Sequence, residues 1–261
     1  MEKQSRVAGR QKPKVSGAGV GGIFRRGGKD NMLKELIDKF YLDRQRDREQ
    51  RHFYITDAGK CARALFFKFK NAPRKDMEAS VLRLFDHGDH IHQLIMKPLL
   101  SIRDIHVVAS EINIPPQEII SGRSDAIVSD GKNLYVLDIK SMNSMIFDKL
   151  AEPKEENIDQ LQLYLHYFKV PKGILLYVNK NSLALKEFVV EYDQARALSL
   201  LQNLAETKKK IDSGLIPDRL PDYPENWQCR YCQFQEICGL SGAGEVKWES
   251  FRKKIEAHKE S

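Results

Sequence analysis

The segment 122–140 places the strongest constraint on how this chain folds. It contains two runs with the alternation typical of β-strands, joined at an Asp-Gly pair that favours a tight hairpin turn. With a loop over residues 130–133, Asp125 falls opposite Asp138 in the paired strands. Lys140 lies on the same face as Asp138, because side chains alternate along a strand. The sequence therefore predicts two carboxylates and one ammonium on one patch of a sheet.

Such a patch needs a compensating partner. Two aspartates on neighbouring positions of paired strands repel each other, and one of them stays protonated unless a cation lies between them. Carboxylate oxygens suit Mg²⁺ or Mn²⁺, and a lysine beside such an ion can orient water and stabilise charge on a phosphate. The three residues alone leave a second interpretation open, a polar outer face on which Lys140 pairs with Asp138 or Asp125.

Two further motifs lie on predicted helices. Residues 77–103 form the longest helical pattern, with His92 on its apolar face and Gly88 one turn earlier, where we expect another backbone to approach closely. An inward histidine is most often a satisfied core residue, so the pattern alone assigns it no role. Gln160 and Tyr164 are four residues apart and share one face of a later helix, which an ordinary amphipathic helix would also explain.

The remaining periodicities predict an alternation of helices and strands. Glu111 is the one acid in the apolar part of a strand, which makes it a second-tier site candidate. Asp193 is the expected N-cap of a helix that stops at Gly214, and Thr56 or Asp57 is the expected N-cap of a helix that holds Cys61, Arg63, Leu65, Phe66 and Phe69. The expected helices are 31–51, 61–69, 77–103, 155–169, 193–213 and 245–258, and the expected strands outside the hairpin are 105–114, 173–179 and 183–191.

The four cysteines form a split pattern. Three of them, Cys229, Cys232 and Cys238, lie within ten residues, and Cys61 lies far upstream. Clustered cysteines in a reducing compartment indicate a metal site more often than a disulfide framework. Four thiolates could hold tetrahedral zinc or an iron–sulfur cluster. Zinc sites more often use two paired Cys-x₂-Cys knuckles, so the spacing is less typical of zinc, and both metals stay open at this point.

The net charge of +7 is unevenly distributed. Residues 1–30 hold eight bases and two acids, while the other 231 residues hold 35 bases and 34 acids. We expect the first segment to be a disordered basic tail that either contacts phosphates or keeps the chain soluble. No apolar run approaches 18 residues and no apolar signal segment follows the N-terminus, so we expect a cytoplasmic protein without a membrane partner.

Taken together, these motifs resemble the PD-(D/E)XK nuclease superfamily, in particular its RecB-like branch. The shared features are Gly-x-x-x-His, Gly-x-x-Asp, Asp-x-Lys and Gln-x-x-x-Tyr, in the order of the family. The split cysteines resemble those of the iron–sulfur exonucleases of the CRISPR-associated and phage type and of the AddB subunit. One departure is Ala62, where the family often has proline after its first cysteine. The resemblance covers about residues 57–240.

The resemblance implies a fold and a set of roles. The fold is α/β (α+β), a restriction-endonuclease-like core with a mixed central sheet flanked by helices. Mg²⁺ or Mn²⁺ is bound beside a lysine that positions the attacking water, and a 4Fe–4S cluster staples the two ends of the chain around the core. The implied metal ligands are His92, Asp125, Asp138 and the carbonyl of Ile139. The implied catalytic residues are Asp125, Asp138, Lys140, Gln160 and Tyr164. The implied cluster ligands are Cys61, Cys229, Cys232 and Cys238, with Arg63 and Glu111 as second-tier residues.

The function implied is that of a metal-dependent DNA exonuclease acting on single strands or DNA ends, with a 5′→3′ preference, in recombination, repair or replication. Two alternatives stay open: a non-catalytic iron–sulfur subunit that binds DNA as a scaffold, and a nuclease that trims DNA for CRISPR spacer acquisition with adaptation proteins as partners. The expected regions are a disordered basic tail (1–30), an N-terminal helical region with the first cluster cysteine (31–75), the nuclease core (76–215), the cysteine cluster region (216–244) and a C-terminal helix (245–261).

Overall fold

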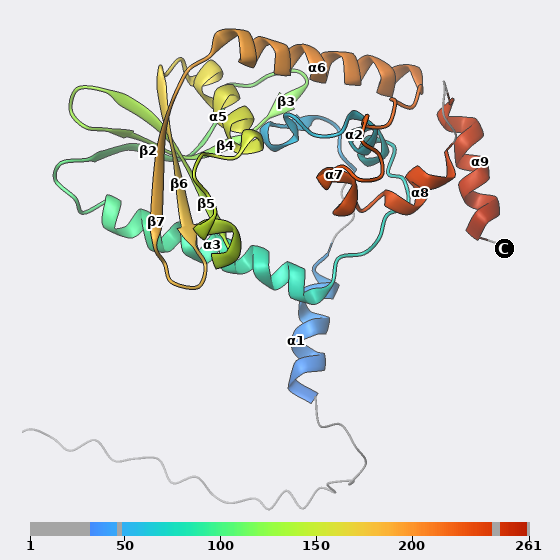
Figure 1. Ribbon diagram of the computed structural model, residues 1–261, viewed down its shortest axis with the longest axis horizontal. Helices are drawn as coiled ribbons and strands as arrows, with labels where there is room; N and C mark the ends of the chain where they lie inside the picture. The colour runs from blue at the N-terminus through green and yellow to red at the C-terminus, as the bar shows by residue number, and fades with distance from the viewer. Residues whose placement is uncertain (1–31, 46–48, 242–245, 260–261) are drawn as a thin grey trace, which may run out of the picture.

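The computed structural model describes residues 32–45, 49–241 and 246–259 (Figure 1). The predicted basic tail, residues 1–30, lies outside these residues. No helix in the described part is long and apolar enough to cross a membrane. The helices are α1 (Met32–Asp43), η1 (Ile55–Asp57), α2 (Ala62–Phe69), α3 (Ala79–Leu99), α4 (Ser144–Asp148), α5 (Glu155–Phe168), α6 (Gln194–Ser213), α7 (Trp227–Arg230), α8 (Gln235–Leu240) and α9 (Trp248–Lys259). The strands are β1 (Phe53–Tyr54), β2 (His106–Asn113), β3 (Ile120–Ser121), β4 (Arg123–Ser129), β5 (Leu134–Met142), β6 (Lys172–Asn179) and β7 (Leu185–Glu191).

A five-stranded mixed sheet forms the centre of the molecule. Its strand order is β2-β4-β5-β6-β7, and only β5 and β6 run parallel. A parallel pair needs a crossover connection, and here the connection contains α4 and α5. Short strands β1 and β3 pair separately in parallel. The predicted fold class, a mixed sheet flanked by helices, is confirmed.

The hairpin between β4 and β5 has the predicted register. Ser129 pairs with Leu134 across a loop over residues 130–133. The Asp130 carboxylate accepts hydrogen bonds from the amides of Lys132 and Asn133, at 2.8 and 2.7 Å. These bonds favour the charged carboxylate and hold its pKa well below its usual range. The turn is therefore fixed by local chemistry that is visible in the sequence.

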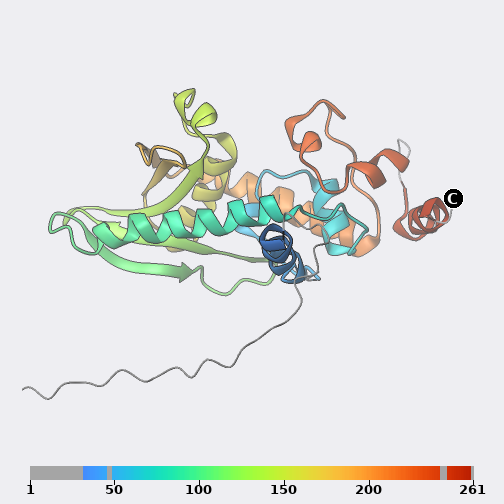
Figure 2. The ribbon, with the colours of Figure 1, turned by 90° about the horizontal axis from the view of Figure 1, so that it is seen from below.

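Helices cover both faces of the sheet. Figures 1 and 2 show α3 along one side of the sheet, and Figure 1 shows α5 and α6 on the other. Ile91 of α3 packs on one face of the sheet, in a core that includes Leu137 and Val178. The larger core lies on the opposite face, where Val136 and Tyr177 of the sheet join residues from α5, α6, α2 and α9. Alternation along β5 therefore places Asp138 and Lys140 on the face that α5 covers.

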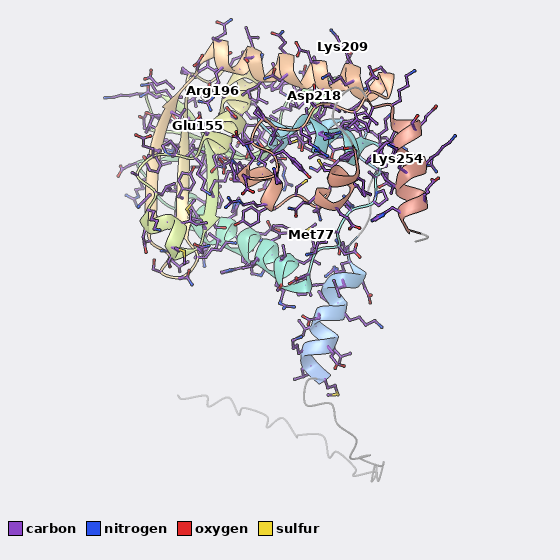
Figure 3. All side chains as sticks on the ribbon, turned by 45° about the vertical axis from the view of Figure 1, so that its right-hand side comes forward. Met77, Glu155, Arg196, Lys209, Asp218 and Lys254 are labelled. Carbon is purple, nitrogen blue, oxygen red and sulfur yellow. The ribbon has the colours of Figure 1, made fainter. Side chains whose placement is uncertain are left out.

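Ionic contacts join the two helices of that second layer. Arg196 of α6 forms ion pairs with Glu155 and Asp159 of α5. Figure 3 labels Arg196 and Glu155 at this junction. Asp193 caps α6 as predicted, since its side chain accepts the Arg196 amide at 3.0 Å. The helix also ends as predicted, at Gly214 in the left-handed conformation, with a φ of 69°.

Two local predictions are wrong. Neither Thr56 nor Asp57 caps the helix after Cys61, because η1 ends at Asp57 and Cys61 itself is the N-cap residue of α2. The Asp57 carboxylate instead is buried and accepts the Tyr54 amide at 3.0 Å. Among the described residues outside α3 itself, no backbone approaches Gly88 closely either, since a Cβ built there would meet only the side-chain oxygen of Ser141, at 3.6 Å.

Helix α1 is shorter than expected and presents its apolar stripe to solvent. Leu33, Leu36 and Phe40 are 69%, 57% and 52% exposed. Polar contacts join the helix to α3, among them the hydrogen bond from Tyr41 to Asp86 at 2.8 Å. The apolar periodicity correctly predicted a helix, but the described structure does not bury that face.

The last helix packs against the N-terminal region. Phe251 and Ile255 of α9 are 0% and 4% exposed and belong to the large core. The Trp248 ring lies 5.9 Å from that of Phe66 and 6.3 Å from that of Phe67, both on α2. Segments from the two ends of the chain therefore share one apolar core.

Close packing of α5 on the sheet gives the first test. A Cβ added at Gly173 of β6 would lie 2.7 Å from the Cδ1 atom of Leu161, which is fully buried. We expect Gly173→Ala to lower the free energy of unfolding by about 1–3 kcal/mol, the usual cost of overpacking a core. Urea unfolding measures the change. Gly88→Ala is the matched control, and in helix α3 it should be neutral or stabilising by up to about 1 kcal/mol. Equal stability of the two variants would contradict the packing described here.

Candidate active site and cysteine pocket

The centre of the site is a buried ion pair on β5. Asp138 is only 2% exposed, and the Lys140 ammonium lies 3.0 Å from its Oδ1 atom and 2.9 Å from its Oδ2 atom. Burial raises the pKa of Asp138, Lys140 opposes that rise, and Asp125 adds to it. The two residues share one face of the strand, as the alternation predicted.

Asp125 lies beside this pair and contacts a strand backbone. Its Oδ2 atom accepts the Ile139 amide at 2.6 Å, and its Oδ1 atom is 3.3 Å from Nδ1 of His92 on α3. The hydrogen bond to Asp125 raises the pKa of His92 against the effect of burial. The structure thus brings together the histidine and the two aspartates that sequence spacing placed on three separate elements.

The helix α5 contributes the remaining pair of predicted residues. The amide oxygen of Gln160 accepts from the Lys140 ammonium at 2.9 Å, so Lys140 is held between Gln160 and Asp138. The hydroxyl of Tyr164 donates to the backbone carbonyl of Arg123 at 2.6 Å, two residues before Asp125. Burial, and then the charge of Asp138, raise the pKa of Tyr164. Both side chains contact parts of the site directly, and their catalytic roles stay predictions.

Glu111 lies apart from this group. Its neighbours Ser110 and Ile112 pair with residues 126 and 124, so its register position on β2 is opposite Asp125. Its φ of 52° is rare for a residue other than glycine, and its side chain is 55% exposed. The carboxylate is 2.8 Å from the Arg123 guanidinium. In the described part of the chain, no hydrogen bond or ion pair joins Glu111 to Asp138.

The donor set fits a divalent cation. Within the described ranges, no group of three or more His, Cys, Asp or Glu side chains is already arranged so that it could hold a metal ion. Among the described residues, the buried Oδ2 atom of Asp138 has the Lys140 ammonium at 2.9 Å as its ionic partner and makes no further hydrogen bond. Carboxylate and carbonyl oxygens together with an imidazole nitrogen are donors that suit Mg²⁺ or Mn²⁺. The residues that would hold an ion are His92, Asp125, Asp138 and the carbonyl of Ile139.

The four cysteines line a single pocket, which is formed by α2, α7, α8 and the segments between them. Cys61 lies at the start of α2, Cys229 on α7, Cys232 after it and Cys238 on α8, and all four are free thiols. Burial raises the pKa of the last three, and neighbouring cysteines raise it further. A bound metal would compensate the thiolate charge that this environment disfavours.

Two arginines contact the same region, and one of them was not identified from the sequence. Arg63 is 3% exposed and lines the pocket, and within the described part of the chain its Nε atom has no hydrogen-bond partner. Burial is the main cause of its lowered pKa, and the nearby Cys238 opposes that effect. Arg219 donates to the carbonyl of Cys238 at 2.7 Å, and its own Nε atom also has no hydrogen-bond partner among the residues that the structure describes. Two buried donors beside four thiols fit an anionic cluster in this pocket.

Gln228 was also missed, and it joins the two ends of the chain. Its side-chain oxygen accepts the Cys61 amide at 2.8 Å, and its side-chain nitrogen donates to the carbonyl of Gly59 at 3.1 Å. A second crossing contact runs from the Lys75 amide to the carbonyl of Gln233 at 2.9 Å. No sequence signal identifies such contacts, because a glutamine beside a cysteine has no preferred partner until the chain is folded.

The comparisons with known proteins agree with this geometry. The profile of the PD-(D/E)XK nuclease superfamily matches residues 30–239, so the chain belongs to that superfamily, as predicted. The CRISPR-associated exonuclease Cas4 of Saccharolobus solfataricus is 28% identical over 216 residues, which cover 79% of this chain and 98% of that protein. The crystal structure of the protein SSO0001 has a TM-score of 0.53 at 24% identity, covering 79% of this chain and 96% of that chain, and shows a shared fold.

The hydrogen bond of Tyr164 gives a second test. Tyr164→Phe leaves the Arg123 carbonyl without its donor in a largely buried site. We expect a loss of about 1–3 kcal/mol in the free energy of unfolding. Denaturant unfolding measures it, with Tyr135→Phe as the control, because the Tyr135 hydroxyl bonds the exposed Asp130 and should contribute little. Equal effects of the two substitutions would contradict a structural contribution from the Tyr164 hydroxyl.

Proposed function

We propose that this protein is a Mg²⁺- or Mn²⁺-dependent DNA exonuclease that acts on single strands or DNA ends, with a 5′→3′ preference. The observation that carries the proposal is the position of Lys140, 3.0 Å from Asp138 and 2.9 Å from Gln160, with Asp125 and His92 beside it. A sheet that only needed a polar face would not bury a carboxylate to 2% exposure at the side of a lysine.

Each residue of the site would have a separate role in hydrolysis. The two aspartates and His92 would bind the divalent ion, which when bound would activate water and stabilise negative charge on the phosphate. Lys140 would orient the attacking water, since its ammonium is held in place by Gln160 and Asp138. Tyr164 would act indirectly, through the backbone that leads to Asp125. The similarity to the exonuclease Cas4 supports exonuclease activity for this chain.

The four cysteines would hold a 4Fe–4S cluster, with zinc as the alternative. The support is one pocket lined by all four thiols and the two buried arginine Nε atoms beside it. The cluster would join segments from both ends of the chain, and closing so long a loop stabilises a fold. In this proposal it has no part in hydrolysis.

Removal of the central carboxylate tests the activity. Asp138→Ala should lower the rate of DNA cleavage by roughly 100-fold or more, because metal binding contributes several kcal/mol to transition-state stabilisation. Oligonucleotides labelled at either end, with Mn²⁺, Mg²⁺ or EDTA, report rate and polarity together. Asp212→Ala, which changes an exposed acid on α6, is the control and should cleave normally. Cleavage by Asp138→Ala at the normal rate would rule out this site.

A second experiment tests the cysteine pocket. Anaerobically purified protein should be brown and contain about four iron and four sulfide per chain. Cys232→Ala should lose the iron and the colour. Stoichiometric zinc without iron would instead establish the alternative metal. A preparation with iron that binds DNA but never cleaves it would favour the non-catalytic scaffolding subunit.

The pathway is a separate proposal. The Cas4 relative is described as CRISPR-associated, and the similarity extends over 98% of that protein. This likeness favours DNA trimming for spacer acquisition, with recombination, repair or replication as the other candidate pathways. Co-purification with CRISPR adaptation proteins would distinguish spacer acquisition from the other pathways.

A further inference from the structure

Two large aromatic side chains beside the cysteine pocket are exposed to solvent. Trp227 begins α7 and is 49% exposed, and Tyr231, four residues later, is 85% exposed. Between and beside them lie Cys229 and Cys232, so the segment that carries the aromatic pair also carries two of the four thiols. Nothing in the proposed chemistry of the active site uses either ring.

The surroundings of the pair combine apolar side chains with positively charged ones. The two rings line a groove with Ala64, Leu65 and Phe234, with several uncharged polar side chains, and with Lys60 and Lys68. The Lys60 ammonium lies 5.3 Å from the centroid of the Trp227 ring, a cation–π contact. The one acid among the described residues that line the groove is Asp57, which already bonds Lys68 at 3.2 Å. The groove therefore carries a surplus positive charge together with two aromatic faces.

A short chain of contacts connects this groove to the active site. Gln228, next to Trp227, donates to the carbonyl of Gly59 at 3.1 Å. Gly59 packs so closely on Asp159 of α5 that an added Cβ would clash with its carboxylate. The next residue of α5 is Gln160, which accepts from Lys140. In Figure 2, α4 and the α7–α8 segment project on the same side of α3.

We infer that Trp227 and Tyr231 form a stacking platform for unpaired bases of a DNA strand that enters the active site, with Lys60 contacting its phosphates. The inference deepens the proposed function and rests on it. Stacking on an aromatic ring accepts any base, and a nearby cation attracts the backbone, the combination that sequence-independent binding of single strands requires. Charge complementarity favours a nucleic acid over an apolar protein segment in this groove.

The test measures the binding of a labelled single-stranded oligonucleotide by fluorescence anisotropy, in the Asp138→Ala background so that no cleavage occurs. Trp227→Ala and Tyr231→Ala should each weaken binding by about 5- to 150-fold, the range for loss of one stacked base. Trp227→Phe and Tyr231→Phe keep a ring and should remain within about threefold of the parent. Phe85→Ala removes a ring of 58% exposure on α3 and should have no effect.

An oligonucleotide with abasic sites separates stacking from other causes. The alanine variants should bind it as weakly as the parent does, because no base is left to stack. The inference also requires that the two alanine variants have the same iron content and the same unfolding midpoint as the parent. Unchanged affinity of both alanine variants for normal DNA would overturn it, as would an equal loss of affinity for normal and abasic DNA.

The outcomes also separate this inference from the proposed function. If the unaltered chain cleaves DNA but the alanine variants bind as tightly as their parent, the stacking platform is rejected and the proposed nuclease activity stands. Platform-dependent binding by a chain that never cleaves would reject hydrolysis and leave the platform in place.

Discussion

The ion pair between Lys140 and Asp138 is the interaction on which the rest of the site depends. A carboxylate at 2% exposure costs several kcal/mol unless it is paired, and here the partner lies two residues along the same strand. Gln160 holds the lysine from α5, and Asp125 accepts the amide of Ile139 between the two partners. Strand register, helix packing and charge therefore have to be correct together.

A second constraint is the joining of the two ends of the chain. The contact from Gln228 to Cys61 spans 167 residues, and the core of the fold lies between them. Helix α9 adds apolar contacts to α2 in the same region. The cysteine pocket thus lies where segments from both ends meet and where Gly59 packs on α5.

Local signals in the sequence predicted local structure well, but they failed where a side chain had a competing partner and where the result depended on how a helix face packs. The Asp-Gly hairpin and the Asp193 cap formed as expected because their hydrogen bonds join residues two or three apart. The expected cap at Thr56 or Asp57 did not form, because Asp57 is buried against Tyr54 and Lys68. The apolar stripe of α1 predicted a helix but not its neighbours.

By itself the sequence determined the two-residue period that puts Asp138 and Lys140 on one face, the register that brings Asp125 beside them, and the order of motifs that identifies the superfamily. Only the tertiary structure decided which atoms meet: Gln160 with Lys140, Tyr164 with a backbone carbonyl, and Arg219 and Gln228 with the cysteine segments. The physical reason is range. Side-chain direction along a strand follows from backbone geometry alone, whereas contacts between residues 19 to 167 positions apart depend on how every intervening element packs.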